Sequence, residues 1–332
     1  MKLRRIHLAT ATALGVLAFV GFGSQAHAGA YAFADLEVTN FEIDKGGVIL
    51  SNAFAGTGGS AGGTVNVTSV VDAFTTVATL NGTTVAQSAN PSNICTGSAA
   101  GCAATGAAPF SFVTPPLTNG SFSQAADLLT GSPVANVLGL PTPANAKTAA
   151  QTQLIGLAGG NASSTLGLTS GFNFTLAGAG TTTLTLKFDG FNNLIAGLDA
   201  TGLSAQASSA LSFTIVDNTT HTTLLSWAPD GTTNITCTAA TACSVIFDPS
   251  NLNTNAGSTT PGFVDTVTNG APQLFEIQFT LPNSDSLTLT INHQTQAFAA
   301  SLASNIPEPT TLALFGVSLL GLGWISRRKK VS

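Results

Sequence analysis

The stretch LFEIQFTLPNSDSLTLTINH, residues 274–293, alternates apolar and polar residues on both sides of a short turn-forming segment. Its apolar positions are Phe275, Ile277, Phe279 and Leu281, then Leu287, Leu289 and Ile291. A period of two predicts strands with one buried face and one wet face, which is typical of antiparallel sheets. Because only residues 282–286 separate the two runs, we expect a hairpin with a slightly long loop.

The same alternation recurs along the chain. It is found in TTTLTLKFDGF (181–191), LSFTIVD (211–217), TLLSW (223–227), YAFADLEVT (31–39), FEIDKGGVIL (41–50) and TVNVTSVV (64–71). The runs at 211–217 and 223–227 are joined by the short segment NTTHT. No regular alternation of strands with helices is seen, which argues against a parallel α/β fold. We therefore predict a mainly β protein, an antiparallel β-sandwich of about 200 residues or more.

Residues 86–170 break this pattern, because they are rich in Ala, Gly, Pro and Asn. The segments SFSQAADLLT (121–130) and AKTAAQTQLIGLA (146–158) could be helical. We expect an irregular Ala/Gly-rich insertion or crossover that carries short helices. An independent second domain is the alternative, but the low density of large apolar residues argues against a separate core.

The charge of the chain excludes several partners. Between residues 29 and 306 the only cations are Lys45, Lys147 and Lys187, and 14 acids leave a net charge of −11. Nucleic-acid binding needs a basic footprint, so no nucleic-acid partner is expected. Binding to anionic lipid is disfavoured for the same reason.

Four cysteines form two close pairs. Cys95 and Cys102 lie in CTGSAAGC, and Cys237 and Cys243 lie in CTAATAC. An even count predicts disulfides if the chain reaches an oxidising compartment, and the spacing favours pairing within each motif. A zinc site would need tighter spacing and usually histidine.

Two loop motifs suggest chemistry only weakly. GGSAG, residues 58–62, matches a nucleophile elbow around Ser60, but a strand-like run follows it where that motif needs a helix. DPSNLNTNAG, residues 248–257, alternates side-chain oxygens as a calcium loop does, yet has a single carboxylate. We interpret the first as a glycine-rich loop and the second as a polar turn.

The remaining candidates do not form an evident site. His221 and His293 adjoin strand ends, where a histidine is usually solvated or capping. Glu42 and Glu276 could serve a glycosidase, but the sequence gives no reason to pair them. Trp227 is the one tryptophan outside the terminal segments, which makes a sugar-stacking platform hard to build. We predict no enzyme activity, no cofactor and no metal; a carbohydrate-binding or adhesive module is the alternative, and a secreted hydrolase is less favoured.

The N-terminal segment has the layout of a secretory signal peptide. A basic start and an apolar run over residues 8–22 precede Ala26-His27-Ala28. Small residues at Ala26 and Ala28 predict cleavage after Ala28, so residues 1–28 form the signal peptide.

The C-terminal segment IPEPTTLALFGVSLLGLGWISRRKK, residues 306–330, joins a proline-acid motif to an apolar run and a basic block. Residues 310–325 carry no charge, and a helix of this length spans about 24 Å at about 1.5 Å per residue. We predict a transmembrane helix there, a little short for a bilayer core of about 30 Å. The basic residues predict a cytoplasmic stop-transfer block: Arg327, Arg328, Lys329 and Lys330.

This order of parts, with Pro307-Glu308-Pro309 at its head, resembles the PEP-CTERM sorting signal. The resemblance covers only the tail, residues 305–332. It implies export by a Gram-negative bacterium, recognition of Pro307, Glu308 and Pro309 by an exosortase-like processing enzyme, and transient anchoring in the membrane. The family is associated with exopolysaccharide and biofilm formation.

These observations predict three parts. A signal peptide (1–28) precedes an exported β-sandwich domain (29–304), and a sorting signal (305–332) follows. We expect an inner-membrane-anchored precursor that faces the periplasm and then a non-enzymatic protein of the cell surface or extracellular matrix, with exopolysaccharide as a possible partner.

Overall fold

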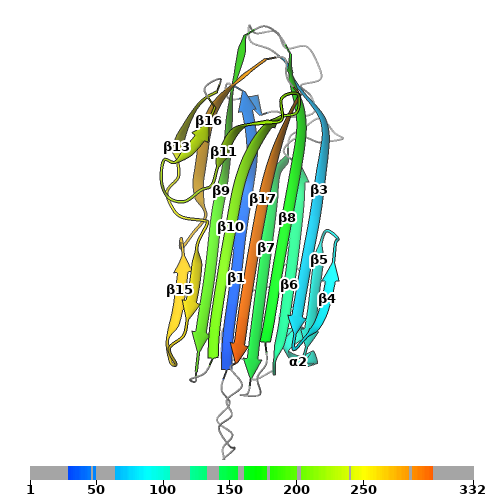
Figure 1. Ribbon diagram of the computed structural model, residues 1–332, viewed down its shortest axis with the longest axis vertical. Helices are drawn as coiled ribbons and strands as arrows, with labels where there is room; N and C mark the ends of the chain where they lie inside the picture. Colours follow the sequence, from blue (N-terminus) through cyan, green and yellow to red (C-terminus); the bar gives the residue numbers. More distant parts are fainter. Residues whose placement is uncertain are drawn as a thin grey trace, which may run out of the picture. The chain divides into compact units, whose positions relative to one another are not determined.

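The computed structural model describes residues 29–45, 48–49, 64–104, 120–132, 142–155, 161–177, 180–199, 203–238, 241–283 and 286–301. The chain divides into two units, residues 28–302 and the two terminal segments, and the described residues belong to the first. These residues form two antiparallel sheets whose inner faces pack together (Figure 1). The prediction of a mainly β, antiparallel protein is confirmed.

Sheet A has a main path of seven strands. In spatial order they are β13 (Ala242–Phe247), β16 (Gln273–Pro282), β9 (Thr181–Leu198), β1 (Gly29–Lys45), β7 (Thr142–Ile155), β6 (Phe122–Ser132) and β5 (Ser92–Gly97). β15 (Val264–Thr268) also pairs with β9, and β2 (Val48–Ile49) pairs with the end of β1. β1, the first strand among the described residues, therefore lies in the middle of its sheet.

Sheet B also has a main path of seven strands. In spatial order they are β12 (Ile235–Cys237), β11 (Thr222–Trp227), β10 (Leu203–Asp217), β17 (Ser286–Ser301), β8 (Asn161–Ala177), β3 (Thr64–Leu80) and β4 (Thr83–Gln87). β14 (Asn255–Ser258) also pairs with β10. The last strand, β17, lies between β10 and β8 in the middle of this sheet (Figure 1).

The expected hairpin at residues 274–293 is wrong. β16 pairs with β9 in sheet A, where Pro282 lies opposite Thr181. β17 begins at Ser286, which lies opposite Thr175 in sheet B. The connection thus crosses from one sheet to the other. Alternation shows that each strand has a buried face, but it does not tell which strand lies beside it.

The expected connection between 211–217 and 223–227 is confirmed, since β10 and β11 pair directly from Asp217 and Thr222 onward. The two short helices expected within residues 86–170 are wrong. Over their described residues, both segments are strands, β6 and β7, which pair with each other in the interior of sheet A. Among the described residues the helix in this region is α2 (Ala99–Ala104). Sheet neighbours on both sides override the weak helix preference of an Ala- and Gln-rich segment.

The runs at 31–39 and 41–50, read as separate strands, belong largely to one strand, β1. Its register against both neighbours shifts between Val38 and Phe41 on one side and between Thr39 and Glu42 on the other. Such a shift is a β-bulge, which adds one residue to the strand. Buried apolar residues consequently change phase, from Leu36 and Val38 before the bulge to Phe41 after it.

Two apolar clusters fill the space between the sheets. The first, the Phe-rich cluster, includes Phe41, Phe172, Phe174, Phe188, Phe213, Trp227, Phe275 and Phe279. The second, the Ala-rich cluster, includes Ala30, Ala32, Ala34, Ala150, Ala162, Ala196, Ala205, Ala207, Ala297 and Ala299. Both clusters draw on strands from both sheets.

Polar side chains separate the two clusters along several strands. On β9, buried Asn192 follows Phe188 of the Phe-rich cluster and precedes Leu194 of the Ala-rich cluster. Buried Ser209 holds the same place on β10, and its hydroxyl donates to the Leu252 carbonyl at 2.8 Å. We call these residues the polar layer: Thr148, Asn192, Ser209, His293 and Thr295.

Candidate functional sites

The outer face of sheet A carries two clusters of one lysine and two acids. In the first, Lys147 of β7 places Nζ 3.3 Å from Asp35 Oδ2 and also contacts Glu37 Oε1. In the second, Lys187 of β9 places Nζ 3.1 Å from Glu42 Oε2 and 3.8 Å from Asp44 Oδ2. All four acids come from β1. We call them the Lys147 cluster and the Lys187 cluster.

The bulge in β1 is what brings all four acids to one face. In a strand, residues two apart share a face, so Asp35 and Glu37 lie on the outer side. Without an extra residue, Glu42 and Asp44 would point into the core. Asn40 adopts the left-handed conformation there, with φ of 55°, and its side-chain amide donates to Asp189 Oδ2 at 2.7 Å.

The Lys147 cluster has unusual electrostatics. Burial raises the pKa of Asp35 to about 7; the charge of Lys147 opposes this rise and the charge of Glu37 adds to it. Burial lowers the pKa of Lys147, but the two carboxylates outweigh burial and raise it overall. The second oxygen of the carboxyl, Asp35 Oδ1, is buried and has no hydrogen-bond partner. Burial thus favours the protonated form of Asp35 although a lysine lies beside it.

The two glutamates considered for glycoside hydrolysis flank a lysine. Glu42 and Glu276 lie opposite Lys187, on the two strands that border β9. The hydrogen bond that Lys187 donates to Glu42 is the largest influence raising the pKa of Lys187, and the charge of Glu276 adds to it. Neighbouring strands are about 4.8 Å apart, so the two acids lie about two strand spacings apart with the ammonium group between them. This arrangement is that of an ion-pair network.

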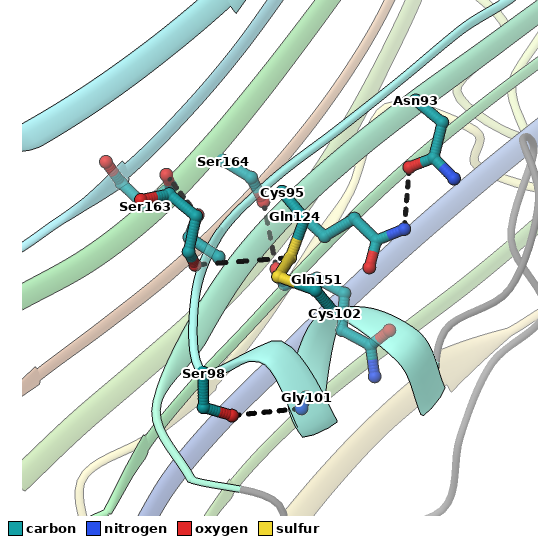
Figure 2. Close-up of a disulfide and its surroundings, with 11 residues drawn as sticks. Asn93, Cys95, Ser98, Gly101, Cys102, Gln124, Gln151, Ser163 and Ser164 are labelled. Carbon is teal, nitrogen blue, oxygen red and sulfur yellow. Dashed lines mark hydrogen bonds between the residues drawn. A yellow bond between two sulfur atoms is a disulfide. The ribbon is translucent and has the colours of Figure 1, made fainter.

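Amide side chains cover another part of the same face, beside the first disulfide (Figure 2). The Gln124 side-chain amide donates to Asn93 Oδ1 at 2.7 Å, and that of Gln151 donates to the Tyr31 hydroxyl at 3.1 Å. Burial raises the pKa of Tyr31 well above its ordinary value. Gln124 and Gln151 lie directly opposite each other on β6 and β7. These contacts use the N–H donors of the two amides, whereas Gln124 Oε1 and Gln151 Oε1 are buried without a hydrogen-bond partner.

Both expected disulfides are present. Cys95–Cys102 joins edge strand β5 to α2, and Gly101 N of that helix donates to Ser98 Oγ at 2.9 Å (Figure 2). Cys237–Cys243 joins β12, at the edge of sheet B, to β13, at the edge of sheet A. The second disulfide therefore ties the two sheets together.

The polar turn at 248–257 uses its oxygens internally. Asp248 accepts hydrogen bonds from the Trp227 indole N–H at 3.3 Å and from Gly231 N at 3.1 Å. Asn253 Oδ1 accepts from Leu211 N at 2.7 Å. Across the described part of the chain, no group of three or more His, Cys, Asp or Glu side chains is arranged to hold a metal ion. N–H donors thus occupy these oxygens as they do in a capped turn.

The structure also places Trp227 and the two histidines considered in the sequence. Trp227 is 1% exposed and packs in the Phe-rich cluster, with its ring centroid 5.2 Å from that of Phe213, so it cannot stack on a sugar at the surface. His293 was expected to be solvated or capping, but it is buried in the polar layer. His221 is exposed in the β10–β11 turn, as expected.

Several predicted residues lie outside the described part of the chain. They are Ala26, Ala28, Ser60, Pro307, Glu308, Pro309, the helix 310–325, and the basic block Arg327, Arg328, Lys329 and Lys330. Among the residues that are described, no helix has the length and apolar character needed to span a membrane.

Comparison with known families identifies the motif in the C-terminal tail. A family model for the PEP-CTERM protein-sorting motif matches residues 305–329. The chain carries a PEP-CTERM sorting motif. The matched span includes Pro307-Glu308-Pro309 and the basic block as far as Lys329. Comparison with curated proteins and with solved structures gives no match.

The PEP-CTERM motif implies a protein exported by a Gram-negative bacterium, with a membrane-anchored precursor that an exosortase processes. It covers the tail and says nothing of the chemistry of the two sheets. The Lys147 cluster was missed in the sequence. Its signal was the i, i+2 spacing of Asp35 and Glu37, but the lysine opposite them depends on the register between β1 and β7.

Proposed function

We propose that the two-sheet body is a non-enzymatic protein of the cell surface or extracellular matrix, which the PEP-CTERM motif delivers to its place. The motif at residues 305–329 is the observation that carries this proposal. The body supports it in two ways. Disulfides at the sheet edges suit an oxidising compartment, and the acids considered for catalysis flank a lysine as in a structural ion pair.

Within this proposal each terminal element has a role. Cleavage after Ala28 releases the leader, and Pro307, Glu308 and Pro309 are the residues that the exosortase recognises. The apolar run 310–325 anchors the precursor in the inner membrane, and the basic block after it holds the tail on the cytoplasmic side. The exosortase then releases the body toward the surface or matrix.

The sorting step is tested by replacing the recognition residues in the full chain. In cells that encode an exosortase, the triple variant Pro307→Ala, Glu308→Ala, Pro309→Ala should stay in the inner membrane at precursor size. The wild-type chain should appear outside with a shortened C-terminus. A matched control, Thr310→Ala with Thr311→Ala, should behave as wild type. If the triple variant reaches the same place at the same size as wild type, the sorting role is wrong.

The matrix role is tested separately. We propose that the released body associates with exopolysaccharide, as the family resemblance implies. Wild-type protein should fractionate with the isolated polysaccharide and should move to the soluble fraction in cells that make no polysaccharide. Equal distribution of the protein in both kinds of cell would contradict this association.

A further inference from the structure

The Lys147 cluster has the parts needed to form a covalent bond. The Lys147 amine nitrogen lies 3.3 Å from Asp35 Oδ2, an oxygen bonded to the carboxyl carbon that the nitrogen would attack. Holding two reacting groups in contact makes their reaction effectively intramolecular. Glu37 contacts the same nitrogen and lies directly opposite Lys147 across the β1–β7 pair. A nucleophile, an acyl group and a proton carrier are thus held together on two adjacent strands.

We propose that Lys147 and Asp35 condense to an intramolecular isopeptide bond, with Glu37 transferring the protons. This inference stands apart from the proposed function, because it needs only the folded body. The bond would join β1 to β7, which lie side by side in sheet A, and would link two residues more than one hundred positions apart along the chain.

The reaction balances within the cluster. The ammonium group of Lys147 first gives one proton through Glu37 to the Asp35 carboxylate, which yields a neutral amine and a neutral acid. The nitrogen lone pair then attacks Asp35 Cγ and forms the C–N bond. A second nitrogen proton passes through Glu37 to the departing hydroxyl as the C–O bond breaks. The products are one amide and one water, and Glu37 returns to its starting state.

The surroundings assign different roles to the two acids. The Asp35 side chain is 9% exposed, whereas that of Glu37 is 26% exposed. Ala149, opposite Asp35 on β7, is fully buried, and Phe33 next along the same face of β1 is 1% exposed. Burial favours the protonated form of Asp35, and a protonated carboxyl is the form that an amine can attack. Glu37, nearer to solvent, is suited to carry protons.

The Lys187 cluster supplies an internal comparison. It has the same composition and the same strand β1, but the lysine side chain is 36% exposed against 28% for Lys147. The acid that approaches Lys187 most closely, Glu42, is itself 17% exposed, while the more buried Asp44 lies 3.8 Å away. We therefore expect condensation at Lys147 and none at Lys187.

The test is peptide mapping of the purified full chain after reduction of the disulfides, with a protease that does not require lysine. Wild-type protein should give a branched peptide that joins the segments around Asp35 and Lys147, lighter than their sum by one water. Lys147→Arg and Asp35→Ala should abolish this peptide, and Glu37→Gln should reduce its yield at least tenfold. The matched control Lys187→Arg should retain it in full.

The wild-type map alone decides the proposal, even if a variant fails to fold. Recovery of separate, unmodified Asp35 and Lys147 peptides from folded wild-type protein would overturn it. Recovery of the branched peptide from Glu37→Gln at wild-type yield would overturn the role of Glu37.

Discussion

At the scale of single residues, Asn40 decides which side chains of β1 face the core. Its positive φ accommodates the extra residue of the bulge, and its backbone N–H donates to Asn145 Oδ1 at 3.0 Å. Asparagine tolerates this left-handed conformation better than most residues, while β-branched residues do not. The Lys187 cluster therefore depends on an exposed residue that is neither its lysine nor one of its acids.

We expect Asn40→Val to destabilise the fold by about 1–3 kcal/mol, because the branched side chain is strained at this φ. Asn40→Gly should cost about 1 kcal/mol, since glycine adopts the conformation freely and only the side-chain hydrogen bond is lost. Urea unfolding of both variants measures the difference. Equal losses for the two variants would show that φ does not control the bulge.

His293 is the second single residue with a large expected effect, in this case on the pH dependence of stability. Burial lowers its pKa to about 3, although the nearby Leu36 backbone acts in the opposite direction. Neither ring nitrogen makes a hydrogen bond of normal geometry. The unfolded chain binds a proton near pH 6.5 but the folded chain does not, so the stability that this group provides is complete above pH 6.5 and is lost as the pH falls toward 3.

We expect the free energy of unfolding of the wild-type protein to fall, through His293, by about 1.4 kcal/mol per pH unit below 6.5, or about 3 kcal/mol by pH 4. His293→Leu should remove this part of the pH dependence, while other groups continue to titrate. Urea midpoints at pH 7 and pH 4 measure it. The control His221→Asn, at an exposed turn residue, should keep the wild-type slope; a wild-type slope in His293→Leu would contradict the assignment.

At the scale of elements, the disulfides lie where sheet A ends. β5 and β13 are the edge strands of its main path, and each contains one cysteine of a disulfide. β13 also has a register shift between Val245 and Phe247, a bulge of the kind that disrupts edge pairing. The edges of sheet A are thus fastened covalently, one to a helix and the other to sheet B.

We expect Cys237→Ala with Cys243→Ala to lose about 2 kcal/mol of stability, the chain-entropy value for so short a loop. Cys95→Ala with Cys102→Ala should lose a similar amount, because the sequence separations are 6 and 7 residues. Hydrogen exchange should distinguish them. The first pair should expose amides of β12 and β13, and the second those of β5 and α2. If either double variant lost protection at the edge that contains the other disulfide, the assignment of each disulfide to its own edge would be wrong.

The sequence predicted individual strands better than it predicted which strands lie side by side in a sheet. Strands with large alternating residues, such as β9 and β16, were recognised from their own pattern. β7 was not, because its inner face is built from Thr148, Ala150 and Thr152, which have little apolar contrast with its outer face. The sheet to which a strand belongs depends on contacts distant in sequence, so the crossing between β16 and β17 had no local signal. The Lys147 cluster was missed for the same reason, since it needs the β1–β7 register.

At the scale of the whole two-sheet body, the core has one region packed with large aromatic side chains and one packed with small side chains. Phe188 and Phe213, with ring centroids 5.3 Å apart, fill the space in the Phe-rich cluster. The Ala-rich cluster uses small side chains from both sheets, including fully buried Ala207 and Ala297. Small residues leave no room for additional atoms when the interior is closely packed. The polar layer divides the two regions.

We expect a large-to-small substitution to destabilise the Phe-rich cluster and a small-to-large substitution to destabilise the Ala-rich cluster. Phe188→Ala should cost about 3–5 kcal/mol through the cavity that it leaves. Ala207→Leu should cost about 1–3 kcal/mol through overpacking. Thr266→Ala, on an exposed strand position, should change stability by less than about 0.5 kcal/mol. Thermal unfolding measures all three. A neutral Ala207→Leu would show that the Ala-rich region has spare volume.

The central position of β17 bears on the timing of export. β8 and β10 flank this strand, so sheet B lacks its middle member until residue 301 is available (Figure 1). The sorting motif begins at residue 305, directly afterwards. Pairings between such distant segments also make folding slow. A chain that crosses a translocon from its N-terminus would thus stay incompletely folded during most of its export. Sheet B could be completed only when the sorting motif is also about to cross.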